Sequence, residues 1–360
     1  MHIPKMKLYR MGSDPEALFV KPVDFDWIIT PAYDIIGRDK KKTTASFIGT
    51  DSRPVIAEIR PNPSRNLKRH LYEIAYAITT TADYLDSSAK WKGNKLMAYP
   101  HILGENLGGH IHASMFLDDP LYLKLKSVGL TFGGGGHYLA QYNGGTGDAP
   151  RNRELETEVM QAIQTRSHIT PLVWGQAMSW LLTPFEKWVQ PWVAREQRNA
   201  HYGAEMSPDA VRLGTSKQPF EIPKMAYVHW EYRLPSTWLQ HPWLAYAYLG
   251  IAKLGLLNMK KLMGLYLEEG KGQKKGLTVA EAFEAPDGLG MPTQFTILKH
   301  GDPSEAGAAF VRNMNRLLPG AHVSRDLLNL MGVVEKCAAR RGAWFSKPTP
   351  VDVEAWRQLL

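Results

Sequence analysis

The chain has 360 residues, of which 44% are hydrophobic, and a single cysteine, Cys337. This predicts a buried core in one large domain or two modest ones, and it excludes a disulfide framework and a cysteine-rich zinc site. No apolar run reaches the roughly 18 residues of a membrane span, so we expect a cytoplasmic protein without membrane contact. The net charge of +8 and the pI near 9.3 favour an anionic partner, such as a nucleotide, nucleic acid or acidic polymer.

The first part of the chain predicts two strands and a helix. Residues 7–20 have a strand-like pattern interrupted by polar side chains, and residues 54–60 alternate with a period of two. This alternation places Glu58 and Arg60 on one face of a strand. Apolar residues then recur at helical spacing as far as about Leu85, in a helix that we expect to begin with Ser64 as its N-cap.

Glycines crowd residues 132–147, where neither a phosphate loop nor a dinucleotide-binding fingerprint occurs. We interpret this segment as a mobile loop that could cover an active site. Further helices are predicted over residues 154–166, 172–188 and 242–257, and the tail from 303 to 360 is mostly helical in pattern. A few strands with polar residues among several helices favour an α+β fold over a doubly wound parallel sheet.

The sharpest local feature is the run Gly108-Gly109-His110-Ile111-His112. On a strand, two histidines two residues apart share one face, and paired glycines allow a backbone or ligand to approach closely. One or both histidines could bind a metal or a phosphate. The alternative for so short a pattern is a pair of ordinary polar side chains.

Acidic residues accompany these histidines. Asp14 and Glu16 lie two apart in the first predicted strand, and Glu58 lies in the second. Burying such acids costs several kcal/mol each unless a cation or hydrogen bonds compensate, and oxygen-rich sites suit Mg²⁺ or Mn²⁺. We therefore predict a divalent-cation cluster built from Asp14, Glu16, Glu58, His110 and Glu231.

The last of these acids, Glu231, lies two residues before Arg233 in an alternating segment. On a strand the two side chains share one face, which indicates a common site for an acid and a guanidinium group. The alternative is a structural Glu–Arg pair on a sheet.

Five short motifs occur in order along the chain: G-S-D-P-E at 12–16, G-T-D-x6-E-I-R-P at 49–61, G-G-H-I-H at 108–112, R-x3-Y-G at 198–203 and E-Y-R-x-P-S at 231–236. Together they resemble the phage-type COOH-NH2 ligases (amidoligases) of the glutamine synthetase and guanido kinase superfamily, over about residues 8–255. The resemblance implies an α+β fold in which a glutamine synthetase-like curved antiparallel sheet carries the active site and helices pack on its outer face. It also implies a catalytic domain at 1–258 and a mostly helical extension at 259–360 that packs on it.

The resemblance further implies ATP and Mg²⁺ (or Mn²⁺) as cofactors. The implied ligands of one cation are Glu16, Asp51 and Glu58. The implied ligands of the cation nearer the transferred phosphate are Asp14, His110 and Glu231. His112 would face the nucleotide. Arg198 and Arg233 would contact the phosphate and would be catalytic residues together with Glu231. Weaker candidates for holding substrate or phosphate are Arg60 and Arg212.

The function so implied is an ATP-dependent carboxylate–amine ligase that forms an amide or isopeptide bond through an acyl phosphate, in a host cytoplasm if the protein is phage-encoded. A carboxylate is a poor electrophile, so it needs this activation, which cations and arginines assist electrostatically. Two alternatives are a metal-dependent hydrolase and a non-catalytic phage or nucleic-acid-binding protein that retains the fold. Arginines beside the acids favour the ligase. The carboxylate and amine substrates and the oligomeric state cannot be read from the sequence.

Overall fold

The computed structural model describes residues 5–24, 26–37, 47–50, 53–118, 130–132, 140–142, 171–190, 211–214, 226–232, 235–273, 302–345 and 347–360. Among these residues, none of the helices combines the length and the apolar character needed to cross a membrane.

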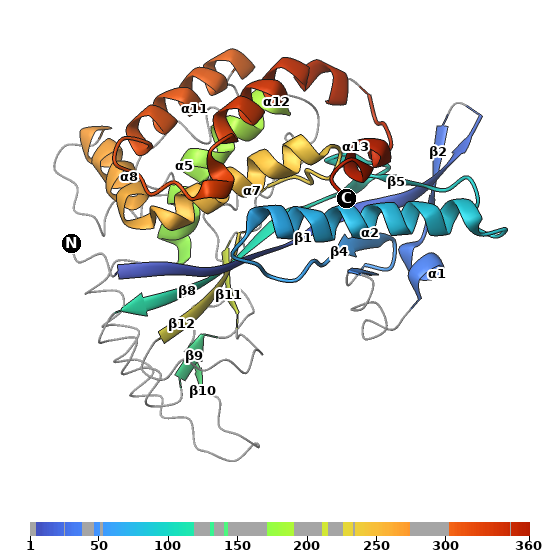
Figure 1. Cartoon of the computed structure of the whole chain (residues 1–360), viewed down its shortest axis with the longest axis horizontal. Helices are drawn as coiled ribbons and strands as arrows, with labels where there is room; N and C mark the ends of the chain where they lie inside the picture. The colour runs from blue at the N-terminus through green and yellow to red at the C-terminus, as the bar shows by residue number, and fades with distance from the viewer. Residues whose placement is uncertain are drawn as a thin grey trace.

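A curled antiparallel sheet lies at the centre of the described fold (Figure 1). Its strands run in the order β11 (Val211–Gly214), β12 (Ala226–Tyr232), β8 (Gly109–Asp118), β1 (Lys5–Val23), β4 (Ile56–Ile59) and β3 (Ile48–Thr50). Two further strands pair with β1, namely β2 (Asp26–Thr30) and β5 (Lys95–Met97). Adjacent strands within this sheet are antiparallel, as predicted.

The two predicted N-terminal strands are confirmed with different lengths. β1 extends past 7–20 at both ends, with a register shift between Leu8 and Arg10, and β4 is shorter than 54–60. All four residues of β4 are buried, including Glu58 with an exposed fraction of 6%. The alternation correctly identified the face that carries Glu58, but both faces of β4 are buried in the folded protein.

Two small antiparallel pairs lie outside the main sheet: β6 (His101–Ile102) with β7 (Glu105–Asn106), and β9 (Leu130–Phe132) with β10 (Ala140–Tyr142). The prediction of one continuous loop over 132–147 is therefore wrong at residues 140–142, which form a strand paired with 130–132. Residues 133–139 and 143–147 lie outside the described residues, as does the helix predicted at 154–166.

The first long helix, α2 (Leu67–Ser87), follows the short α1 (Ala32–Ile36) in the described chain. The N-cap predicted at Ser64 is wrong, because the Asn66 side chain accepts hydrogen bonds from the backbone N–H groups of Lys68 and Arg69. Ser64 instead forms an isolated bridge with Met11 of β1. The start of α2 is thereby tied to the central strand of the sheet.

Most of the remaining helices cover one side of the sheet (Figure 1). They are α5 (Pro171–Val189), α7 (Pro242–Leu257), α8 (Met259–Gln273), α11 (Pro303–Leu317) and α12 (Leu330–Phe345). The helices predicted at 172–188 and 242–257 are thus confirmed, and so is the helical character of the tail. A short 3-10 helix, η3 (Arg325–Leu327), and α13 (Val353–Arg357) complete the described tail.

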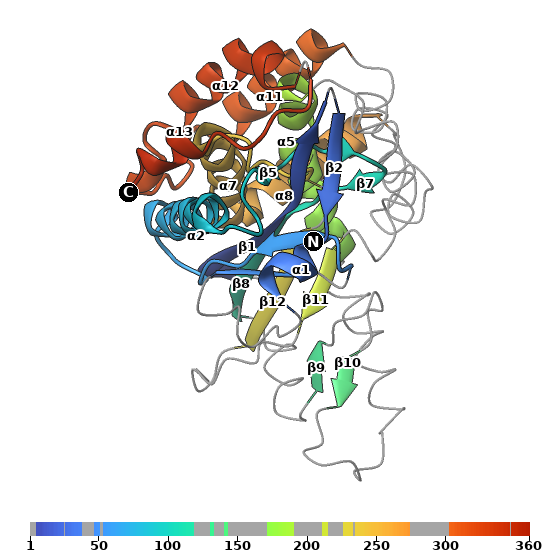
Figure 2. The ribbon, with the colours of Figure 1, turned by 90° about the vertical axis from the view of Figure 1, so that its right-hand side faces the viewer.

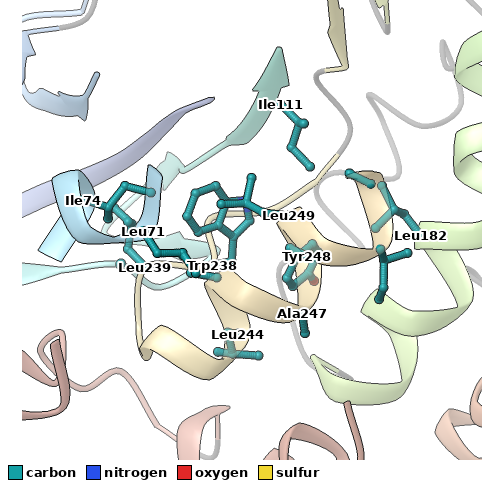
Figure 3. Close-up of a cluster of buried hydrophobic side chains, with 14 of the residues drawn as sticks. Leu71, Ile74, Ile111, Leu182, Trp238, Leu239, Leu244, Ala247, Tyr248 and Leu249 are labelled. Carbon is teal, nitrogen blue, oxygen red and sulfur yellow. The ribbon is translucent and has the colours of Figure 1, made fainter. Parts of the chain in front are cut away.

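The core fills the space between these helices and the sheet (Figure 3). Trp238 is fully buried next to Leu71 of α2 and Leu249 of α7, while Ile111 extends toward this cluster from β8. α7 is hydrophobic on nearly all sides, as expected for a helix buried between two layers. The strand that carries the two histidines is therefore supported from behind by packed apolar side chains.

Residues beyond 258 contact elements that precede this position. The Val351 N–H donates to Leu96 O of β5 at 2.8 Å, and the buried Trp356 indole donates to Leu239 O at 2.9 Å. In α11, a Cβ on Gly307 would overlap the Trp188 ring of α5, so glycine permits close packing of these two helices. The tail is in this way joined to both the sheet edge and the helical layer.

Candidate metal centre

Cross-strand pairing brings the predicted site positions into one band across the sheet. Directly opposed residues of antiparallel strands lie on the same face. The register pairs Glu16 with Glu58, Asp14 with His110, Gly12 with His112, His112 with Glu231, and Glu231 with Arg212. Positions that span some 200 residues of sequence are thus neighbours on strands β4, β1, β8, β12 and β11.

Three of these residues form a compact group of potential ligands. One atom each from Asp14, Glu58 and His110 lies within 4.8 Å of the other two. Ligand atoms that surround one divalent cation at about 2.0–2.6 Å necessarily lie this close to one another. His110 and Glu58 are buried and Asp14 is partly buried, so the group lies in a protected setting.

A buried carboxylate oxygen of Asp14 fits a cation. Asp14 Oδ1 lies 2.9 Å from His112 Nε2 and 3.3 Å from His110 Nδ1, which are ion-pair distances. Beyond these two ion pairs, this buried oxygen has no further hydrogen-bond partner among the described residues. A bound cation would add a direct ligand interaction with the charged carboxylate.

The ionisation of Asp14 also suits a metal ligand. Burial raises the pKa of its carboxyl group, but the neighbouring His112 and His110 lower it by more. The net result is a pKa well below the usual range of aspartate. The carboxylate is therefore charged at neutral pH, which is the form that binds cations.

The paired glycines before His110 are required by close contacts. A Cβ on Gly108 would overlap the His110 imidazole, and a Cβ on Gly109 would overlap Ser236 O and the Trp238 ring. The Trp238 indole also donates to Gly109 O at 3.1 Å. The two glycines thus let His110 fold back over the backbone and let the buried Trp238 reach the strand.

Glu16 is not one of the three residues of this compact group, and its carboxylate contacts the backbone of Gly108. Its Oε2 accepts a hydrogen bond from the Gly108 N–H at 2.5 Å, and its own N–H donates to Gly108 O at 2.8 Å. Thr237 Oγ1 donates to Glu16 O at 2.7 Å. Glu16 is the register partner of Glu58. Its hydrogen bonds with Gly108 therefore hold the backbone that precedes His110.

A guanidinium group lies at the edge of the candidate centre. Arg60 forms an ion pair with Glu58 and donates a second hydrogen bond to Thr50 O at 3.0 Å. Its side chain is 31% exposed, compared with 8% for Glu58. The Arg60 guanidinium group therefore lies at the more open side of the ligand group, paired with Glu58.

Behind the centre lies a buried pair that the sequence analysis did not identify. His70 of α2 contacts Ser13 Oγ through Nε2 at 2.8 Å and Asn62 O through Nδ1 at 3.1 Å. Burial lowers the pKa of His70 to about 4, the Asn62 contact raises it and His112 lowers it further. His70 occupies an inward position of the helix, which is the signal that could have revealed it. The neutral imidazole of His70 thus holds Ser13, the residue that precedes Asp14 in β1.

The other predicted residues are placed only in part. Asp51, Arg198 and Arg233 lie outside the described residues. Glu231 and Arg212 are described through their backbone, as register partners of each other.

No protein-family model and no curated protein sequence matches this chain. Among solved structures, a bifunctional glutathione synthetase from Pasteurella multocida aligns with a TM-score of 0.37 and 12% identity, covering 98% of this chain and 50% of that one. A structure described as a novel glutamine synthase homolog aligns with a TM-score of 0.39 and 12% identity, covering 98% and 71% respectively. The chain thus spans half the length of the first of these proteins. Alignments at this level of similarity carry no functional assignment.

Proposed function

We propose that this protein is an ATP- and Mg²⁺-dependent carboxylate–amine ligase with a glutamine synthetase-like sheet. The observation that supports it most directly is the convergence of Asp14, Glu58 and His110, from three adjacent antiparallel strands, within 4.8 Å of one another. The same residues belong to three of the five ordered motifs that resemble phage-type amidoligases.

In this proposal the acids and His110 hold Mg²⁺ or Mn²⁺, which would neutralise the phosphates of ATP. Asp14 brings a charged carboxylate beside His110 and His112, and Glu58 brings a second carboxylate next to Arg60. Glu16 and the paired glycines keep the ligand-bearing backbone in place. Glu16, Asp51 and Glu231 are further proposed ligands, and His112 would face the nucleotide.

The proposed reaction has two steps. An oxygen of the substrate carboxylate attacks the γ-phosphorus of ATP, so that ADP leaves and an acyl phosphate forms. The amine then attacks the acyl carbon, phosphate leaves, and the amine nitrogen loses a proton to a base that we do not assign. Arg60, Arg198, Arg212 and Arg233 are the proposed contacts for phosphate or substrate, since a guanidinium group offers a planar fork to an anion.

The main alternative is a metal-dependent hydrolase, in which the same ligands would activate water. The ion pair between Arg60 and Glu58 favours phosphate chemistry, because hydrolysis does not require a guanidinium group beside the metal ligands. The second alternative is a non-catalytic protein that keeps the fold.

An isotope experiment separates these functions. The protein is incubated with ATP, Mg²⁺, a mixed amine pool and ¹⁸O-labelled carboxylates, and phosphate and products are analysed by mass spectrometry. A ligase transfers ¹⁸O from the carboxylate to phosphate and yields an amide. A hydrolase releases products with no such transfer, and a non-catalytic protein yields neither. Glu58→Gln should abolish the transfer, while the exposed Asp34→Asn should retain it.

The role of Arg233 can be tested separately from folding. Lysine keeps the positive charge but loses the planar fork, so we expect Arg233→Lys to fold and to bind Mn²⁺ normally. Turnover should fall by about 10²-fold or more, the loss typical for one transition-state donor. Normal turnover, or an unfolded variant, would show that Arg233 is a structural partner of Glu231.

A further inference from the structure

A row of exposed side chains on α2 combines positive charge with aromatic rings. Lys68, Tyr72 and Tyr76 follow one another at four-residue intervals, so they lie along one side of the helix. Tyr72 is 47% exposed and Tyr76 is 44% exposed, so both rings are accessible to a ligand. Arg65 and Arg69 are also exposed at the same end of the helix.

The row lies on the outside of the molecule, and the residues just before α2 contact β1 near the candidate metal centre. α2 runs along the surface in both views (Figures 1 and 2), with its inner side packed on the core. Backbone hydrogen bonds of 2.8 and 3.0 Å join Ser64 to Met11 of β1. Pro63 packs within 3.5 Å of the Cβ position of Gly12, which is the register partner of His112.

Charge is distributed unevenly along α2. Of its acidic residues, Glu73 is buried, accepts the Asn62 N–H at 2.7 Å and forms an ion pair with Arg69 at 3.4 Å, which leaves Lys68 and Arg65 as the other cations of this end. Asp83 and Asp86 lie toward the far end of the helix, where Asp83 pairs with Arg357 at 2.9 Å and Asp86 with Lys95 at 3.5 Å. The end with the exposed cations therefore has a net positive surface.

One of the two rings is held in place before any ligand binds. Phe47 contacts Tyr76 edge to face, with ring centroids 6.2 Å apart and planes at 82°. A ring that is already oriented loses less conformational entropy when a flat partner stacks on it.

We propose that this face of α2 binds single-stranded nucleic acid. Its basic end, Arg65, Lys68 and Arg69, would contact phosphates, while Tyr72 and Tyr76 would stack on unpaired bases. Duplex nucleic acid hides the faces of its bases inside the stack, so it would gain from the cations alone. An acidic protein would likewise use the cations but would not need two exposed rings in line with them. This surface does not depend on the proposed ligase activity.

The proposal is tested by fluorescence anisotropy with a labelled oligothymidylate of about twelve nucleotides. We expect Tyr72→Ala and Tyr76→Ala each to weaken binding by about 10-fold, and the matching phenylalanine variants to bind as the unmodified protein does. Lys68→Glu should weaken binding and reduce the slope of log affinity against log salt by about 0.7, which corresponds to one lost phosphate contact.

Matched controls separate this surface from general basicity. Lys92→Glu changes the net charge by the same amount as Lys68→Glu, but at an exposed position beyond α2. Tyr84→Ala removes an exposed ring at the acidic end of the helix. Both should leave affinity unchanged. Equal affinity for a duplex of the same length, or alanine variants that bind as tightly as the unmodified protein, would overturn the proposal. So would competition by polyglutamate as strong as that of unlabelled oligothymidylate, or no binding at low salt.

Discussion

At the scale of single residues, Asp14 offers the sharpest test of the metal centre. One of its carboxylate oxygens lies within 4.8 Å of ligand atoms of Glu58 and His110, and its buried Oδ1 forms ion pairs with His110 and His112. Asp14→Asn removes the charge but keeps the shape, so we expect a folded variant whose affinity for Mn²⁺ falls by at least about 10-fold.

The measurement is isothermal titration with Mn²⁺, supported by thermal unfolding with and without the ion. A bound cation stabilises the folded state by mass action, so Mn²⁺ should raise the Tm of the unmodified protein and of the exposed control Asp34→Asn. It should have little effect on Asp14→Asn. If Asp14→Asn were stabilised by Mn²⁺ as strongly as the control, the cation would bind elsewhere.

At the scale of elements, one buried ion pair fastens the C-terminal segment to two helices. Lys253 of α7 donates to Asp326 Oδ2 of η3 at 2.6 Å, and the same oxygen accepts the N–H of Leu67, the first residue of α2, at 2.7 Å. Burial raises the pKa of Asp326, but the hydrogen bonds from Lys253, Ser324 and Leu67 lower it by more, so the carboxylate is charged.

Because Lys253 is 4% exposed, removal of its partner leaves a buried ammonium group without a carboxylate. Asp326→Asn should therefore lower the free energy of unfolding by about 3 kcal/mol, measured by urea denaturation. The matched control is Asp83→Asn, which breaks the exposed pair with Arg357 and should cost no more than about 1 kcal/mol. Equal losses in the two variants would show that the buried pair has no special role.

At the scale of the whole molecule, two buried histidines make stability depend on pH. Burial lowers the pKa of His70 and that of His241 to about 4, from 6.5 in an unfolded chain. For His241, Asp352 partly opposes this effect and Arg340 adds to it. Between pH 4 and pH 6.5 the two histidines bind more protons in the unfolded state than in the folded state. Their contribution to the free energy of unfolding is therefore complete above about pH 6.5 and is lost as the pH falls toward 4.

We expect the free energy of unfolding to decrease over this range, with a slope of up to about 1.4 kcal/mol per pH unit for each histidine. Urea denaturation at several pH values, in the presence of a chelator, measures this slope. His241→Asn keeps a side chain that can cap α7, yet it removes one titrating group, so its slope should be smaller. An unchanged slope in this variant would rule out His241 as a source of the pH dependence.

The sequence by itself determined the periodic elements of this protein. Alternation in residues 54–60 and helical spacing in 172–188 and 242–257 reflect local geometry, which short-range patterns encode. The residue types also indicated a cation cluster, since acids and histidines in strands are costly to bury without one. The N-cap was misassigned because Ser64 and Asn66 are both suitable caps, and only the bridge from Ser64 to Met11 decides between them.

Only the tertiary structure decided which of the predicted residues meet. Strand order and register place Asp14 opposite His110 and Glu16 opposite Glu58, and no local pattern specifies pairing between strands so far apart in sequence. The structure likewise separates Asp14, whose Oδ1 forms ion pairs with two histidines, from Glu16, whose carboxylate holds Gly108. Helical spacing puts His70 on the inward side of α2, but only the tertiary structure shows that its partner there is Ser13 of β1.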